Sequence, residues 1–265
     1  MIPNIDLGCR CLHMSSLFRR DAEGVPTVKL VLYGPSLAGK TSLLSIYSIL
    51  KRVEDPSSVY SELKKIDDPS GRTALFDQSV FELPKGQGTS LPLMRYALYT
   101  VAGQDRYRET RKVVLRGTDG LMIMVDPQVE QWESNKRSLE ELMDLMGSEI
   151  TSGNVPWVFV VNKIDLPKEE RKGQQDFLNL LVETGLVKDI GEAYEKYLEM
   201  SCLDARNDLL AMPRRKDWKE HLDSSGRLRR DARPPSVVKA AQPIEHLTRL
   251  VIEHKIKLIR AKKPQ

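Results

Sequence analysis

The segment LYGPSLAGKTSLL, residues 32–44, constrains the possible folds more than any other part of this chain. It matches the pattern G-x-x-x-x-G-K-[ST]; an apolar, β-branched run at 27–33 precedes it and helical spacing of apolar residues follows it. The glycines allow a tight turn that directs backbone N–H groups toward phosphate oxygens, and the following helix presents its positive end. We therefore expect a phosphate-binding loop between a strand and a helix, in preference to a chance turn.

Residue types within this loop suggest individual roles. Lys40 is expected to reach the β- and γ-phosphates, and the Thr41 hydroxyl is expected to ligate Mg²⁺. The other nucleotide contacts expected here come from Gly34, Ser36, Leu37, Ala38, Gly39 and Ser42. The loop predicts nucleotide binding but does not identify the base.

Strand-like and helical segments alternate along the rest of the chain. Strands are predicted at 73–84, 91–102, 120–126, 155–165 and 197–202, and helices at 129–148, 168–185 and 243–259. The hairpin signal KGQGTS separates the first two of these strands, whereas helices separate most of the later ones. The pattern predicts an α/β protein with the P-loop NTPase fold: a mostly parallel sheet, one antiparallel hairpin strand and helices on both faces.

Length and composition indicate one domain with additional segments. A chain of 265 residues with 40% hydrophobic and 29% charged residues is typical of a globular protein, and no apolar run approaches the roughly 20 residues that span a bilayer. We expect an N-terminal extension at 1–26, which could add an edge strand, and a nucleotide-binding domain at 27–262. Within that domain we expect a polar, proline-broken insertion at 205–242 before a last helix at 243–262, opened by Pro243.

The N-terminal residues and the cysteines suggest a cellular compartment. The first 20 residues lack a charged start followed by an apolar stretch, so no secretory signal is predicted. Cys9, Cys11 and Cys202 fit neither a disulfide framework nor a four-ligand zinc site, and we expect free thiols. A cytoplasmic location is therefore expected.

The segment NKID, residues 162–165, indicates the base. The Asp165 carboxylate can accept two N–H bonds from the guanine edge, which adenine cannot supply, while the Asn162 amide contacts the base and the stem of Lys163 covers it. Ser201, Cys202 and Leu203 end the next predicted strand and are expected beside the same base. So short a motif could be an ordinary turn, but its place downstream of a phosphate loop favours GTP or GDP as the ligand.

Two further segments are expected near the γ-phosphate. In TVAGQ, residues 100–104, Gly103 could donate its N–H to the γ-phosphate and Gln104 could orient the attacking water. In GRT, residues 71–73, Thr73 could bind Mg²⁺ and the γ-phosphate in the triphosphate state alone, so the order of the segment would depend on the nucleotide. Arg72 is a candidate arginine finger in cis, or an exposed arginine in a loop.

These motifs together resemble the Ras-like small GTPases, and within them the MglA-type prokaryotic polarity GTPases. The resemblance lies in YGPSLAGKTSLL, RT before LFD, LYTVAGQDRYRETRKVVLRGTDGLMIMVD and NKIDLP, and covers about residues 26–205 plus the last helix. It implies hydrolysis of GTP to GDP with Mg²⁺, Gln104 and Arg72 as catalytic residues, Thr41 and Thr73 as metal ligands, and a roadblock-domain protein as regulator. Gly71, where that branch has an acidic residue, the longer spacing from NKID to SCL and the basic insertion depart from it.

Thr100 is another departure from the wider family, although the MglA-type branch shares it. Most GTPases carry Asp at this position, where it supports Mg²⁺ through the water shell. Asp77, on the partner strand of the predicted hairpin, is the best candidate to replace that carboxylate, and an Asp77 that faces solvent is the alternative. The substitution favours a second hypothesis, in which the chain holds nucleotide, hydrolyses it poorly and acts as a scaffold.

Basic charge is concentrated in the C-terminal quarter. Residues 206–265 contain 16 Lys and Arg against 7 Asp and Glu, so the remainder of the chain is net negative. Such a segment could contact an anionic surface, an acidic protein or nucleic acid, or be the solvated end of a core helix. No effector is indicated by this charge.

Asp126 ends the predicted strand at 120–126 and is expected to cap the helix that follows it.

Overall fold

The computed structural model describes residues 18–67, 73–83, 92–103, 107–212, 219–224 and 228–261. These residues form an eight-stranded sheet in the order β3-β4-β5-β2-β6-β7-β8, with β1 paired to β2 outside this path. The strands are β1 (Arg19–Arg20), β2 (Pro26–Tyr33), β3 (Val59–Asp67), β4 (Thr73–Glu82), β5 (Arg95–Thr100), β6 (Gly120–Val125), β7 (Trp157–Val161) and β8 (Tyr197–Glu199).

Most neighbouring strands of the sheet run parallel. β2 lies between β5 and β6 and is parallel to both, and the parallel pairing continues through β7 to β8. The carboxyl ends of these strands therefore lie at one edge of the sheet, where α/β proteins bind their ligands. β4 is antiparallel to both β3 and β5, and its pairing of Gln78 with Tyr99 brings Asp77 next to Thr100.

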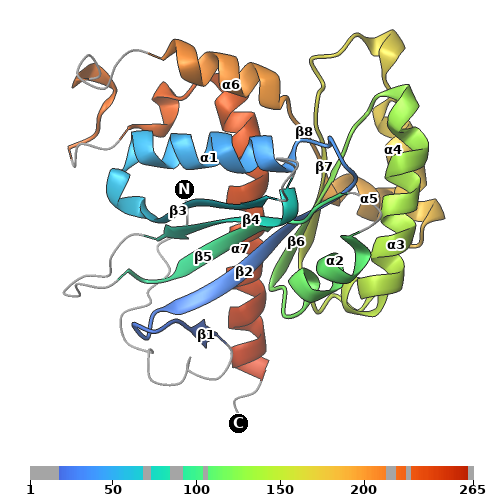
Figure 1. Ribbon diagram of the computed structural model, residues 1–265, viewed down its shortest axis with the longest axis horizontal. Helices are drawn as coiled ribbons and strands as arrows, with labels where there is room; N and C mark the ends of the chain where they lie inside the picture. Colours follow the sequence, from blue (N-terminus) through green and yellow to red (C-terminus); the bar gives the residue numbers. More distant parts are fainter. Residues whose placement is uncertain are drawn as a thin grey trace.

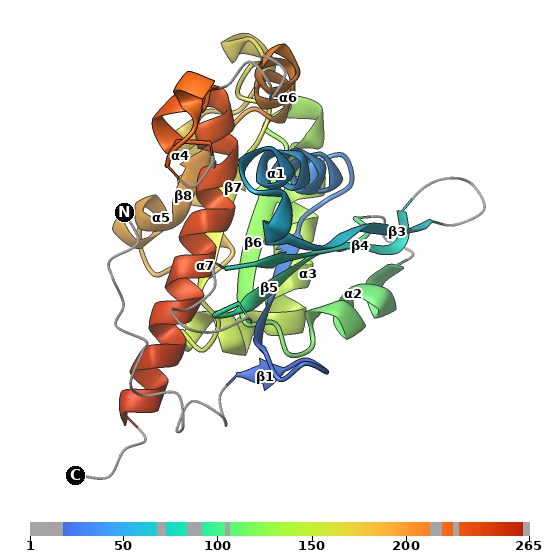
Figure 2. The same ribbon diagram turned by 90° about the vertical axis from the view of Figure 1, so that its left-hand side faces the viewer.

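Helices cover both faces of the sheet (Figure 1). One side carries α1 (Lys40–Glu54), α6 (Cys202–Ala211) and α7 (Pro235–Ala261), and the other carries α2 (Arg108–Leu115), α3 (Trp132–Thr151), α4 (Gln174–Glu183) and α5 (Ile190–Lys196). Single 3-10 turns lie at Pro56–Ser58, Val129–Gln131, Lys168–Glu170, Lys219–His221 and Arg230–Ala232. The turned view shows α7 running along the length of the sheet beside β6 and β7 (Figure 2).

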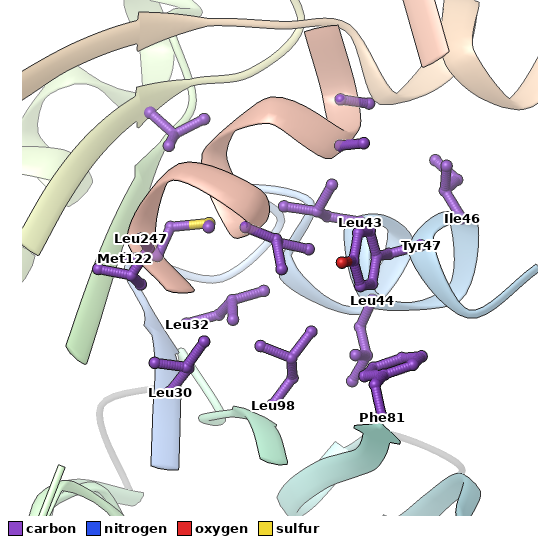
Figure 3. Packing of buried hydrophobic residues seen from close by; sticks show 14 of the residues in the cluster. Leu30, Leu32, Leu43, Leu44, Ile46, Tyr47, Phe81, Leu98, Met122 and Leu247 are labelled. Atoms are coloured by element: carbon purple, nitrogen blue, oxygen red, sulfur yellow. The ribbon is translucent and has the colours of Figure 1, made fainter. Parts of the chain in front are cut away.

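Alternation of side chains along β2 divides the core into two layers. Leu30 and Leu32 belong to the cluster under α1 and α7, whereas Val31 and Tyr33 belong to the cluster under α3. A strand with helices on both faces must be apolar on both sides, which is why β2 is a continuous buried run. Figure 3 shows the first layer, in which Leu247 of α7 meets the sheet beside the side chains of α1.

The predicted fold class is confirmed, and several local elements differ from the prediction. The sheet is mostly parallel, β4 is the antiparallel hairpin strand, and helices lie on both faces. Strand β3 and the helices α2, α5 and α6 were not predicted, because their sequences are polar or short and carry little periodicity. The predicted turn at 85–90 lies outside the described residues.

The predicted start of the last helix is wrong. α7 begins at Pro235, eight residues before the expected start, and Pro243 lies inside it. Pro243 has no N–H to donate to the carbonyl four residues earlier, but Val237, Ala240 and Ala241 before it are buried against the core, which stabilises the helix across the proline. The segment 205–242 therefore starts within α6 and ends within α7.

Candidate functional site

The predicted phosphate loop lies between β2 and α1, in the strand–loop–helix arrangement expected from the sequence. Gly39 has a φ of 97° and is the N-cap residue of α1, and Leu37 also has a positive φ, of 65°. A Cβ atom on Gly39 would lie 2.1 Å from the amide nitrogen of Asn162, so a larger residue would collide with it. The N–H groups at the start of α1 thus lie beside this loop, where a phosphate can accept from them.

Lys40 lies folded over the loop and is almost fully buried. Its Nζ donates to the carbonyl oxygens of Gly34 at 2.8 Å and Pro35 at 2.6 Å. Burial lowers the pKa of Lys40 to about 7; the positive charge of Arg111 adds to this shift, and Asp77 opposes it. A phosphate group at the loop would offer this ammonium the negative charge that the carbonyls lack.

Gly103, after β5, lies directly against the phosphate loop. A Cβ atom at this position would lie 2.3 Å from the nitrogen of Ser36 and 2.4 Å from the carbonyl carbon of Pro35. Only a glycine allows two backbone segments to approach so closely. The structure therefore brings Gly103 and Ser36, both predicted contacts, side by side.

Asp77 of β4 is hydrogen-bonded both to β5 and to the start of α1. Its Oδ2 accepts the Thr41 hydroxyl at 2.6 Å and the Thr100 hydroxyl at 2.9 Å, and its backbone N–H donates to Thr100 Oγ1 at 3.0 Å. The carboxylate is fully buried, and among the described residues its Oδ1 has no hydrogen-bond partner. A buried carboxylate oxygen without a donor, beside a threonine hydroxyl, fits a cation such as Mg²⁺.

The other residues predicted near the γ-phosphate are only partly described. Thr73 is the first residue of β4, paired through its backbone with Asp67, and its side chain is outside the described part. Three residues of extended strand lie between it and Asp77, so the two Cα atoms are about 13 Å apart. Arg72 and Gln104 lie outside the described residues, as do Gly71, Cys9 and Cys11.

On the base side, the Asn162 side chain links two loops. Its Nδ2 donates to the Ala38 carbonyl at 2.9 Å, and its Oδ1 accepts the Cys202 N–H at 2.9 Å. Asn162 is buried, so these bonds fix the phosphate loop relative to the loop after β8. The amide nitrogen carries two protons, which leaves one for contact with a base.

Lys163 has a φ of 58°, and its side chain reaches back to β6. Its Nζ forms a salt bridge with Asp126 Oδ2 and donates to Gln128 Oε1 at 3.1 Å. Asp126 does not cap the next helix as expected: the N-cap of the 3-10 turn that follows is Gln128. The buried Asn135 of α3, which sequence reasoning missed, bonds both backbone groups of Asp126.

The remaining predicted base contacts surround this point. Ser201 is the N-cap of α6, where its side chain accepts the Asp204 N–H, while Asp165 and Leu203 are exposed. Burial raises the pKa of the Cys202 thiol to about 12, with the Asp165 charge adding to the shift and the Asn162 hydrogen bond opposing it. Cys202 is therefore a neutral thiol at neutral pH, and Asp165 is open to a ligand.

Arg111 of α2 is a further residue that sequence reasoning missed. It donates to the Ala102 carbonyl at 3.0 Å and forms a bidentate pair with Glu141 of α3, at 2.8 and 2.7 Å. Together with Gly34, Gly103 and Ser138, this pair lines a cavity of about 130 Å³. Arg111 thus links the segment before Gly103 to α3.

Part of the predicted basic cluster is neutralised inside the fold. Arg233 is buried and forms salt bridges with Glu54 of α1 and Glu245 of α7, and Lys255 pairs with Asp119 at 2.6 Å. Arg229, with a neighbouring Asp231, stays at the surface. Further basic residues of this quarter lie outside the described residues, namely Arg214, Arg215, Lys216, Arg227, Lys262 and Lys263. None of the described helices is long and apolar enough to cross a bilayer.

Comparison with known proteins agrees with this geometry. The profile of the Ras family matches residues 90–207. The Mutual gliding-motility protein MglA of Myxococcus xanthus (strain DK1622) is 36% identical over 141 residues, which cover 52% of this chain and 68% of that protein. With a phosphate loop, an NKID base motif and a mixed sheet in the expected order, the chain belongs to the Ras-like small GTPases, close to MglA, and is an enzyme that hydrolyses GTP.

Proposed function

We propose that this GTPase is a molecular switch whose affinity for a partner depends on whether GTP or GDP is bound. The observation that carries the proposal is the Asn162 amide, which bonds the phosphate loop at Ala38 and the loop after β8 at Cys202. It holds a phosphate site and a base site in one frame. In this proposal residues 34 and 36–42, with Gly103, bind phosphate, and Asn162, Lys163, Asp165 and residues 201–203 bind guanine.

The chemistry of the residues around Asp77 supports a Mg²⁺ site. Thr41 and Asp77 would hold the ion, and Thr73 would approach it in the triphosphate state. When bound, Mg²⁺ supplies positive charge that neutralises the β- and γ-phosphates. Most GTPases have an Asp at the position of Thr100, and here Asp77 would supply that carboxylate instead. The Thr100 hydroxyl would hold the Asp77 carboxylate in place.

Hydrolysis would follow from positioning and charge. We propose that Gln104 orients a water molecule in line with the γ-phosphate and that Lys40 and Arg72 take up negative charge as the bond to the leaving oxygen breaks. Intrinsic turnover would be slow, because a partner usually completes the positioning of water and arginine in this class of enzyme.

Substitution of Gln104 tests this mechanism. Gln104→Leu should bind GDP and GTP as the unmodified protein does, while the single-turnover rate with bound GTP falls at least tenfold, roughly the loss expected when one positioning group is removed. Gln175→Leu, on the exposed face of α4, is a matched control that should leave both quantities unchanged. Undiminished hydrolysis in Gln104→Leu would remove this residue from the mechanism.

A scaffold that holds nucleotide and hydrolyses it poorly is the second candidate function, and Thr100 is the observation that favours it. The same single-turnover assay separates the two, because a scaffold would leave the γ-phosphate intact for hours. Tighter binding of ATP than of GTP would contradict both candidates.

Regulation and organisation complete the proposal. A GTPase-activating or regulatory protein would control the switch, and the likeness to MglA favours a roadblock-domain protein as this regulator. The basic residues of the C-terminal quarter that remain exposed, such as Arg229, would face an anionic surface. In this division, 27–262 is the GTPase domain, 1–26 an extension, and the part of 205–242 between α6 and α7 the basic insertion.

A further inference from the structure

Asp126, at the carboxyl end of β6, is a buried carboxylate that the proposed hydrolysis does not use. It is fully buried, and its Oδ2 forms a salt bridge with Nζ of Lys163. The Lys163 side chain is 30% exposed, so its ammonium lies between the buried carboxylate and solvent. The ion pair therefore has one partner that can reach water and one that cannot.

The backbone of Asp126 is hydrogen-bonded to α3. The buried Asn135 accepts the Asp126 N–H at 3.2 Å and donates to the Asp126 carbonyl at 2.6 Å. The N–H of Gln128 donates to Asp126 Oδ1 at 3.1 Å, so Lys163 is left with the other carboxylate oxygen. These hydrogen bonds hold the backbone and the carboxylate of Asp126 in an orientation that points Oδ2 toward Lys163.

The backbone of the NKID loop is also attached to its neighbours. Asn162 donates its N–H to the Val125 carbonyl at 3.2 Å, and Ile164 donates to Met200 at 3.3 Å. Lys163 lies between these anchors with left-handed backbone, a conformation that few residues with a Cβ adopt. The backbone places the Lys163 Cα, and the ion pair with Asp126 then selects where its long side chain lies.

We propose that Asp126 is a positioning residue for nucleotide binding: it holds Lys163 against the base and thereby slows nucleotide dissociation. This rests on the proposed role of Lys163 as the residue that covers guanine. Without the carboxylate, the lysine side chain would exchange among many rotamers in water, and the binding of each nucleotide would have to restore a single one. Asp126 acts through Lys163 and does not need to touch the nucleotide.

The unequal burial of the two partners allows a clean test. Asp126→Asn keeps the size of the side chain and an oxygen for Gln128, and the released ammonium can enter solvent, so the protein should fold. Dissociation of a fluorescent GDP analogue should become roughly 10- to 100-fold faster, the effect of losing a hydrogen bond to a charged group. The rate at which bound GTP is hydrolysed should not change, because the phosphate side keeps its contacts.

A double-mutant cycle separates positioning from a merely structural role. Lys163→Met should also speed dissociation, and in that background Asp126→Asn should add nothing further, because its effect passes through the lysine. Melting temperatures should follow a different pattern. Lys163→Met leaves the buried carboxylate without its counter-charge and lowers the melting temperature, whereas adding Asp126→Asn to that variant raises it again. Asp144→Asn, on the exposed side of α3, should match the unmodified protein throughout.

The possible outcomes are distinct. Additive effects of the two substitutions on dissociation, or an unchanged dissociation rate in Asp126→Asn with a normal fold, would overturn the positioning role. If Lys163→Met itself leaves the dissociation rate unchanged, the proposed base site fails instead, and the positioning role fails with it. If the unmodified protein binds no guanine nucleotide, the proposed function as a whole is wrong.

Discussion

The two halves of the proposed nucleotide site differ in how their polar groups are satisfied. On the base side, the Asn162 side chain bonds Ala38 and Cys202. Lys163 pairs with Asp126, whose carbonyl accepts a hydrogen bond from Asn135 of α3. On the phosphate side, the Lys40 ammonium bonds two carbonyls of its own loop, and a buried oxygen of Asp77 has no partner among the described residues. On the base side these three side chains have protein partners and the exposed Asp165 is open to a ligand, whereas the phosphate side has groups whose best partners are anions and cations.

This difference separates recognition from switching. In the proposed site, a half whose side chains already have protein partners would bind guanine without changing shape, and it would do so equally for GTP and GDP. The phosphate half, in which the Lys40 ammonium bonds carbonyls of its own loop, would have to rearrange when phosphate and metal bind. The size of that rearrangement would depend on the number of phosphates. We therefore expect substitutions on the base side to change affinity for both nucleotides, and substitutions on the phosphate side to change the response to metal, pH and the γ-phosphate.

The largest effect should come from Gly39, where the halves touch. In Gly39→Ala the new Cβ would collide with the Asn162 amide, and the residue would keep a φ of 97°, which alanine disfavours. GDP affinity should fall roughly a hundredfold or more, because both halves are displaced. Calorimetric titration with GDP measures this loss.

Gly24→Ala is the matched control for that substitution. Gly24 also has a positive φ, of 78°, but a Cβ there would meet nothing within 4 Å. Its cost should be confined to backbone strain, with GDP affinity unchanged. If the two variants bound GDP equally well, the contact between the halves would not matter for the site.

The next largest effect should come from Asp77. Chelation of Mg²⁺ should speed GDP release from the unmodified protein, and in Asp77→Asn this acceleration should shrink by roughly tenfold, because a neutral amide cannot replace a carboxylate beside the cation. Release kinetics with and without EDTA measure it. Asp144→Asn should respond to EDTA as the unmodified protein does, and an unaltered response in Asp77→Asn would assign the metal to other ligands.

The smallest effect should appear as a pH dependence of phosphate binding. With the pKa of Lys40 at about 7, the nucleotide-free protein loses this proton above pH 7 and must regain it to hold phosphate. GDP affinity should therefore fall as pH rises from 7 to 8, by less than about tenfold. Below pH 7 the lysine is already charged and this contribution is constant.

Two comparisons locate that pH dependence on the phosphate side. Guanosine, which has no phosphate, should bind with the same affinity across this range, and Lys40→Met should bind GDP weakly with a flat profile. A slope that survives in Lys40→Met would place the titrating group elsewhere in the site.

Sequence reasoning predicted what is encoded by local spacing. The phosphate loop and NKID depend on residues a few positions apart at the end of a strand, and alternation of strands and helices predicted the sheet. Asp77 could be nominated beside Thr100 because a hairpin pairs neighbouring strands in register.

Contacts between distant elements could not be predicted in this way. The bonds of Arg111 to Glu141 and of Asn135 to Asp126 depend on how α3 lies against the sheet, and the local sequence around Arg111 and Asn135 does not indicate these partners. The start of α7 was misplaced for a related reason: local propensity treats Pro243 as a helix boundary, whereas burial of the preceding turns outweighs one missing hydrogen bond.

The salt bridges of Arg233 have a consequence for shortened or fused forms of the protein. Arg233 lies just before α7 and contacts Glu54, at the last turn of the helix that begins with the phosphate loop. A chain cut after α6 would lose the helix that covers one face of the sheet, and Glu54 would keep Lys51 as a counter-charge but lose its arginine. The basic quarter is therefore not a detachable tail, and a cut made to isolate a minimal GTPase must retain Arg233 and the helix that follows it.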